Sequence, residues 1–205
     1  GRVFCLLVNE LFIMDVIIKD PSGELKIIRG FFTEEESQCY FEHLNEQLAF
    51  EQQDIVMFGK KIAIPRLESF HSLNGETYGY SGKRLESKPF DQVLSAIKIR
   101  IEESFRLLFN SVLVNLYRNE NDSNGWHADD EKELGLNPVI ASLSLGFTRR
   151  FQLKHKESST THSLLLGSGD LVIMGGALQH FWKHQVPKEK FICGPRINLT
   201  FRFIY

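Results

Sequence analysis

From Ser111 to the C-terminus, apolar residues recur at nearly every second position of the chain. An alternation with period two is typical of strands that bury one face, and turn residues such as Asn124–Gly125 and Gly175–Gly176 separate successive runs. The predicted strands are Val112–Tyr117, Val139–Leu145, Arg150–Lys154, Ser163–Leu166, Leu171–Met174, His180–Val186 and Ile197–Ile204. A run of short strands that follows two helices predicts an α+β domain built round a double-sheet jelly roll.

The first half of the chain supplies those helices and a hairpin. Thr33 and Glu36 form a capping box, which predicts that a helix begins directly after Thr33. The stretch Ile55–Ile64 indicates a hairpin region that ends at Pro65. A second helix is expected to carry Pro89 in its first turn, where proline is tolerated.

Length and composition are those of an ordinary globular domain. The chain has 205 residues, of which 42% are hydrophobic and 24% charged, and its formal net charge is −2. We expect one domain over residues 15–205, whereas residues 1–14 form an uncertain leader because Met14 could be a natural start. Charged and polar residues interrupt the apolar stretch Val3–Ile18 too early for a membrane span, which needs ~20 apolar residues.

Three scattered cysteines suit a reducing compartment rather than a disulfide scaffold. No secretory cleavage pattern is visible in the sequence. We therefore expect an intracellular protein, cytoplasmic in a bacterium or nuclear in a eukaryote, that works as a monomer without a membrane partner. The near-neutral charge argues against a histone-like binder but leaves room for a local basic patch.

A metal site is indicated by His127 and Asp129, which lie two residues apart and so share one side of an extended backbone. A third ligand is available about fifty-five residues later. Spacing alone leaves both His180 and His184 open, and His184 is preferred because it precedes Val186 at a strand end. Two histidines and one carboxylate form the facial triad of non-haem Fe(II) oxygenases.

The C-terminal strand indicates an anion site. One of its faces carries Arg196, Asn198, Thr200 and Arg202, while the residues between them are apolar. The two arginines lie roughly 20 Å apart at ~3.3 Å per residue, and their side chains can reach inward to a short dianion with a carboxylate at each end. Asn115 and Tyr117 share one face of their own strand and could add neutral hydrogen bonds to the same ligand.

These residues together resemble the signature of the AlkB family of Fe(II)- and 2-oxoglutarate-dependent dioxygenases. The resemblance runs from about Val56 to Tyr205, and the residues that carry it are Asn115–Leu116–Tyr117, His127, Asp129, His184 and the strand Arg196–Arg202. It implies a double-stranded β-helix core with the N-terminal helices packed on one sheet. It also implies Fe(II) on His127, Asp129 and His184, O2 as oxidant, and 2-oxoglutarate bound by Arg196, Arg202, Asn115, Tyr117, Asn198 and Thr200.

The substrate-binding residues are predicted in two places. In a nucleotide-recognition region at about 54–90, Phe58 beside Lys60 could enter a base stack and hold phosphate, and Tyr78 and Tyr80 could stack on an extruded base. A second basic cluster is expected at the mouth of the site from Arg149, Arg150, Lys154, His155 and Lys156. Asp130 and Glu131 follow the metal pair, and a carboxylate there could pair with a base that methylation has made cationic.

The repair members of the family resemble this chain in the Tyr78-to-Gly82 stretch and in Asp129–Asp130–Glu131. The resemblance implies oxidative demethylation of 1-methyladenine and 3-methylcytosine in DNA, coupled to decarboxylation of 2-oxoglutarate and release of formaldehyde. The same fold acting on RNA, tRNA or protein stays open at this point. A binding module that has lost its chemistry would have no reason to keep the triad and both arginines. A zinc hydrolase would leave the arginines unexplained.

Overall fold

The computed structural model describes residues 1–7, 10–57, 60–75, 78–80 and 83–205. Its helices are α1 (Glu34–Gln47), α2 (Gln92–Phe105), the single turn α3 (Leu178–Phe181) and a 3-10 turn at Lys132–Leu134. Its strands are β1 (Arg2–Leu7), β2 (Glu10–Asp20), β3 (Gly23–Arg29), β4 (Glu51–Met57), β5 (Lys60–Ser72), β6 (Tyr78–Tyr80), β7 (Lys83–Leu85), β8 (Ser111–Tyr117), β9 (Asn124–His127), β10 (Ile140–Gly146), β11 (Arg149–His155), β12 (Thr161–Leu166), β13 (Leu171–Gly175), β14 (Trp182–Val186) and β15 (Arg196–Arg202).

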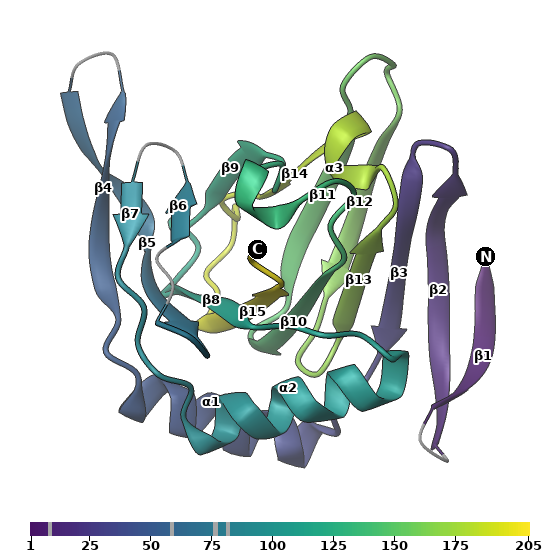
Figure 1. The fold of residues 1–205 in the computed structure, drawn as a ribbon, viewed down its shortest axis with the longest axis horizontal. Helices are drawn as coiled ribbons and strands as arrows, with labels where there is room; N and C mark the ends of the chain where they lie inside the picture. The colour runs from purple at the N-terminus through teal and green to yellow at the C-terminus, as the bar shows by residue number, and fades with distance from the viewer. Residues whose placement is uncertain (8–9, 58–59, 76–77, 81–82) are drawn as a thin grey trace.

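Two antiparallel sheets form the predicted jelly roll (Figure 1). The larger sheet has the order β1-β2-β3-β13-β10-β15-β8-β5-β4, and the smaller has the order β12-β11-β14-β9. A hairpin of β6 and β7 stands beside the β4–β5 hairpin. The two sheets face each other, and apolar side chains of both, such as Tyr117, Ile140, Phe151 and Trp182, form a core between them.

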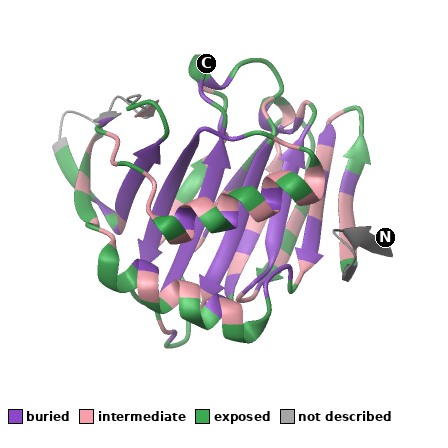
Figure 2. Ribbon diagram, turned by 60° about the horizontal axis from the view of Figure 1, so that its bottom comes forward, coloured by how far each residue is buried: buried purple, intermediate pink, exposed green. Residues whose placement is uncertain are grey.

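Helices α1 and α2 cover the outer face of the larger sheet (Figure 2). Their buried residues, including Leu44, Leu94 and Ile97, join one apolar core with the sheet residues Val114 and Leu199. The capping box that begins α1 is confirmed: Thr33 Oγ1 accepts from the Glu36 amide at 3.2 Å, and Glu36 Oε2 accepts from the Thr33 amide at 2.8 Å. The larger sheet is thus covered on one side and free to form a site on the other.

Three expectations about element ends were wrong, each for a local reason. The second helix begins only at Gln92, because the Asp91 side chain caps it by accepting from the Leu94 amide at 2.7 Å; Pro89 lies outside the helix. Strand β5 runs on past Pro65, since the β4–β5 register shifts there and a bulge tolerates a residue without an amide proton. The predicted strand His180–Val186 begins at Trp182, because residues up to Phe181 form α3.

The N-terminal stretch forms strands. β2 runs across the boundary expected after Met14 and pairs with β3 from Ile13 to Asp20. Within the part of the chain that the structure describes, no helix is long and apolar enough to cross a membrane.

Candidate active site

The strand β15 places four polar side chains on the inner side of the larger sheet. It lies between β8 and β10, where Asn198 is opposite Asn115 on one side and Ser144 on the other. Its apolar residues, Ile197, Leu199 and Phe201, pack into the core beneath the helices. The polar residues of the opposite face, Arg196, Asn198, Thr200 and Arg202, are all buried and line a cavity of about 350 Å³ between the sheets. The alternation predicted for this strand is confirmed.

The two histidines of the predicted metal site meet across a strand pair. His127, the last residue of β9, lies opposite His184 of β14, and their ring centroids are 4.3 Å apart. Ligand atoms of His127, Asp129 and His184 all lie within 4.8 Å of one another, which suits a metal ion. His180 is exposed on α3, so the fold itself selects His184 from the two candidates.

Hydrogen bonds and charges prepare these side chains to bind a cation. His127 Nδ1 donates to the Gly125 carbonyl at 2.7 Å, which leaves Nε2 with its lone pair. Burial lowers the pKa of His184 to about 3 and also lowers that of His127. Burial acts to raise the pKa of Asp129, but the charge and hydrogen bond of Arg202, together with the two histidines, lower it to about 2. At neutral pH the group therefore has two neutral imidazoles and one carboxylate, the protonation state that a divalent metal requires.

The other end of the cavity is positively charged. Arg196 is 1% exposed; its Nη2 donates to Ser144 Oγ at 2.8 Å, whereas Nε and Nη1 have no hydrogen-bond partner among the described residues. Burial lowers the pKa of Arg196 to about 10, so the side chain is still charged at neutral pH. Such a group is costly to bury alone, and an anion in the cavity would supply the missing partner.

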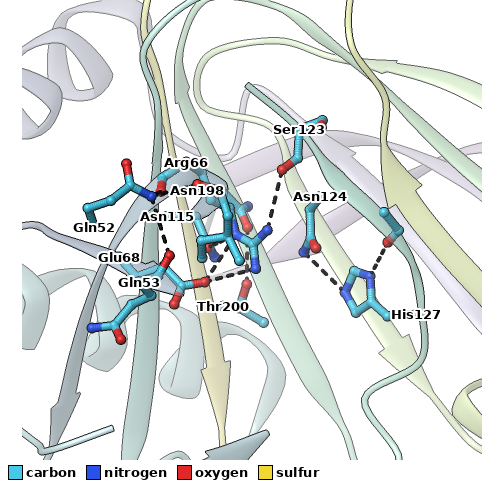
Figure 3. Close-up of polar contacts among 12 residues, drawn as sticks. Gln52, Gln53, Arg66, Glu68, Asn115, Ser123, Asn124, His127, Asn198 and Thr200 are labelled. Atoms are coloured by element: carbon cyan, nitrogen blue, oxygen red, sulfur yellow. Dashed lines mark hydrogen bonds and ion pairs between the residues drawn. The ribbon is translucent and has the colours of Figure 1, made fainter. Parts of the chain in front are cut away.

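Arg66, which the sequence reasoning missed, lines the cavity and contacts Asn115 and Glu68 (Figure 3). Arg66 Nε donates to Asn115 Oδ1 at 2.9 Å, and Arg66 Nη2 lies 2.8 Å from Glu68 Oε1. The contact uses the oxygen of Asn115, so its amide nitrogen is free of this bond and can face a ligand. Because Arg66 and Glu68 are two residues apart, alternation along β5 could have indicated them, but Pro65 was taken as the end of the strand.

The sequence is similar to proteins of known activity. Residues 24–202 match the family model of the 2OG-Fe(II) oxygenase superfamily. The chain is 41% identical over 198 residues to the human alpha-ketoglutarate-dependent dioxygenase alkB homolog 3, covering 90% of this chain and 68% of that protein. It is 36% identical over 158 residues to the human DNA oxidative demethylase ALKBH2, covering 73% of this chain and 60% of that protein.

The chain belongs to the AlkB family of Fe(II)- and 2-oxoglutarate-dependent dioxygenases. The fold agrees: a solved structure of OsALKBH1 superposes with a TM-score of 0.58 at 18% identity, covering 92% of this chain and all of that one. Family membership implies Fe(II) and 2-oxoglutarate, and the His127, Asp129 and His184 cluster fits the metal.

In this AlkB-family chain the structure separates the two acidic residues that follow Asp129. Glu131 lines the cavity. The Asp130 side chain is 61% exposed and lies 3.5 Å from Lys156 Nζ, and it does not belong to the cavity lining. Of the two carboxylates, that of Glu131 therefore lines the cavity that contains the metal cluster.

The predicted nucleic-acid contacts at 54–90 are only partly described. Phe58 lies outside the described residues, and for Lys60, Tyr78 and Tyr80 the backbone is placed in strands but the side chains are not described. Figure 1 shows that these strands form two hairpins at the same end of the jelly roll.

The basic cluster predicted at the mouth is divided in this AlkB-family chain between buried and more exposed residues. Arg149 is buried and donates to the carbonyls of Asn119, Asp122 and Pro187, and Arg150 pairs with the buried carboxylate of Glu189. Arg149 is buried because it points to the inner face of β11, like Phe151 and Leu153.

The remaining members of that cluster lie on or near the surface. Lys154 Nζ stands 4.5 Å over the ring of Trp126, whose side chain also lines the cavity. Lys156 is engaged with Asp130.

Proposed function

We propose that the protein removes methyl groups oxidatively from N-alkylated bases in nucleic acid, with 1-methyladenine and 3-methylcytosine in DNA as substrates. The observation that carries this proposal is that one cavity contains the metal cluster, the buried cation Arg196 and the carboxylate of Glu131. A relative at 36% identity carries the name DNA oxidative demethylase, which supports the same reaction.

His127, Asp129 and His184 would hold the iron, and the residues of β8 and β15 would hold 2-oxoglutarate. The buried Arg196, with two nitrogen atoms that lack partners among the described residues, fits one carboxylate of this dianion. Tyr117, Asn115, Asn198, Thr200 and Arg202 line the same cavity. When bound, the metal and co-substrate supply the oxidation: 2-oxoglutarate and O2 yield succinate and CO2, and the oxidised N-methyl carbon leaves as formaldehyde.

The chain's own residues position the reactants and set the charge around them. Arg66 fixes the orientation of the Asn115 amide toward the co-substrate. Glu131 places negative charge in the cavity, which favours a base that carries a positive charge through methylation at adenine N1 or cytosine N3. The same methylation blocks the pairing edge of the base, so less free energy is needed to extrude it.

The two hairpins over residues 54–90 would bind the strand on either side of the extruded base. In this proposal Tyr78 and Tyr80 stack on bases, while Phe58 and Lys60 contact the base stack and the phosphate backbone. Trp126 stands at the cavity wall and offers a further aromatic surface.

The test is to incubate the purified protein with Fe(II), 2-oxoglutarate and oligonucleotides that carry 1-methyladenine or 3-methylcytosine. We expect the oligonucleotide to lose one CH2 unit in mass and formaldehyde to appear in equal amount. Parallel reactions with the same sequence as DNA and as RNA, and with a methylated peptide, decide the substrate class. Turnover of 2-oxoglutarate without any loss of mass from the nucleic acids would overturn the proposal.

Glu131→Gln serves as the matched variant. Because it removes the negative charge but keeps the size, it should reduce the rate on cationic 1-methyladenine more than on 1-methylguanine, which is neutral. An equal reduction on both bases would argue against a charge-reading role for Glu131.

A further inference from the structure

Asp129, which supplies the carboxylate of the metal cluster, lies just outside the hydrogen-bonded strands of the smaller sheet. Strand β9 ends at His127, so Asp129 lies beyond its pairing with β14. A buried backbone amide needs a hydrogen-bond acceptor. For Asp129 that acceptor is the side chain of Gln179, whose Oε1 lies 3.0 Å from the amide nitrogen. The position of Asp129 therefore depends on a residue fifty positions further along the chain.

Burial and contacts of both its side chain and its backbone hold Gln179 in place. It is 2% exposed on the single turn α3, and its Nε2 contacts Met174 Sδ at 3.6 Å. Its backbone carbonyl accepts from Lys156 Nζ at 2.9 Å, and the Lys156 amide donates to the Phe181 carbonyl at 2.7 Å. Lys156 thus ties the end of β11 to α3 at two points, which holds Gln179 beneath Asp129.

The same lysine reaches the residue next to Asp129. Lys156 Nζ lies 3.5 Å from Asp130 Oδ2, so Asp129 and Asp130 are both tied to the α3 region, one through its backbone and the other through its side chain. We call Gln179, Lys156 and Asp130 the α3 latch. With these neighbours held, Asp129 turns toward the histidines and Glu131 toward the cavity.

We infer that Gln179 and Lys156 are positioning residues that hold the carboxylates of Asp129 and Glu131 in their working orientation. Asp130, on this view, acts through the latch and does not contact the base. The inference rests on the proposed function, because it assumes that Asp129 binds the metal. Partners that orient metal ligands commonly change metal affinity by about 10- to 100-fold when they are replaced.

The central test is the affinity of the protein for Mn(II), titrated by calorimetry on the metal-free protein, with no substrate present. Gln179→Met keeps the length of the side chain but removes the acceptor for the Asp129 amide. We expect its Mn(II) dissociation constant to rise about 10-fold or more. Gln152→Met is the control, because Gln152 pairs with Gln185 on the outer face of the same sheet. Its dissociation constant should equal that of the wild type.

The Mn(II) titration distinguishes a failure of the proposed function from a failure of the α3 latch. If the wild-type protein does not bind Mn(II), the metal role of Asp129 fails and with it the proposed function. If the wild type binds and Gln179→Met binds equally well, only the latch is overturned.

Lys156 offers a second route should Gln179→Met fail to fold, since its side chain is partly exposed. Lys156→Met should weaken Mn(II) binding, and Lys156→Arg, which keeps a donor for the Gln179 carbonyl, should restore most of it. Equal affinity in Lys156→Met and the wild type would contradict the inference.

The role of Asp130 gives a further readout. Asp130→Asn should change the rates on cationic 1-methyladenine and neutral 1-methylguanine by the same factor. A loss confined to the cationic base would show that Asp130 reads the base and would overturn its assignment to the latch.

Discussion

The two ends of β15 carry the same residue in opposite electrostatic situations. Arg202 lies 3.0 Å from the carboxylate of Asp129, and both side chains are almost fully buried. Arg196, six residues earlier on the same face, has the Ser144 hydroxyl and the ring of Tyr117 as neighbours. Arg149 lies against the same ring, but its guanidinium is 3.7 Å from the buried carboxylate of Glu189, which balances its charge.

The difference shows that the charge of a buried arginine can be balanced by a side chain of the protein or left to be balanced by a ligand. The charge of Arg202 is balanced within the chain and keeps the pKa of Asp129 low. The charge of Arg196 meets a hydroxyl and an aromatic ring, and burial lowers its pKa. We therefore expect substitutions at Arg202 to act mainly on stability and on the metal cluster, and substitutions at Arg196 to act mainly on co-substrate affinity.

Arg202→Met should have the largest effect on stability. It leaves Asp129 buried without this counter-ion, and breaking a buried pair in this way costs about 3–5 kcal/mol. The pKa of Asp129 should rise as well. Urea denaturation of the metal-free protein measures the loss. Lys26→Met, which breaks the half-exposed pair of Lys26 with Glu24, is the control and should cost less than about 1 kcal/mol. Equal losses in the two variants would refute the difference between buried and exposed pairs.

Arg196→Met should have the opposite effect, with little loss of stability but a large loss of co-substrate affinity. The free energy of unfolding of the metal-free protein should stay the same or rise, because an apolar side chain replaces a buried cation that has few partners. The dissociation constant of 2-oxoglutarate, titrated in the presence of Mn(II), should rise about 100-fold, which corresponds to about 3 kcal/mol of charge-assisted hydrogen bonding. A loss of stability as large as that of Arg202→Met would mean that the protein already neutralises Arg196.

Both arginines could be predicted from sequence because alternation along a strand is a local property. Ile197, Leu199 and Phe201 identify the buried face against the helices, and the polar face follows from the period of two. The inward direction of Arg149 was available from the same rule, since it is in phase with Phe151. It was missed because basic residues were counted without regard to the face on which they lie.

Other features depend on the fold and could not be predicted from spacing. Spacing alone leaves His180 and His184 both open, and the preference for His184 rests on its place at a strand end. What excludes His180 is the single turn α3, which the strand-like composition of His180–Val186 conceals. The separation of Asp130 from Glu131 depends on Lys156, which follows β11 and contacts Asp130. Arg66 was missed because Pro65 suggests a strand end, whereas the irregularity in the pairing between Gln52 and Asp54 lets β5 continue.

The pH dependence should also distinguish the two ends. The pKa of His184 is about 3 in the folded protein, so below pH ~6.5 the unfolded chain binds a proton that the folded protein does not. Stability of the metal-free protein should therefore fall as the pH drops from 6.5, by at most about 2 kcal/mol down to pH 5 for this residue. His184→Asn should flatten the slope, while Arg196→Met should keep it. A slope unchanged in His184→Asn would contradict the low pKa.

The smallest expected effect tests whether Ser144 works through Arg196. Ser144→Ala removes the hydroxyl that accepts from Arg196 Nη2 at 2.8 Å, which leaves the guanidinium less well oriented. The dissociation constant of 2-oxoglutarate should rise about 5-fold, as expected for one hydrogen bond of about 1 kcal/mol. In the Arg196→Met background the same substitution should change the affinity little, because the group that Ser144 orients is gone. If the two effects add instead, Ser144 contacts the co-substrate directly, and the charged end of the cavity contains one more ligand-binding group than Arg196 alone accounts for.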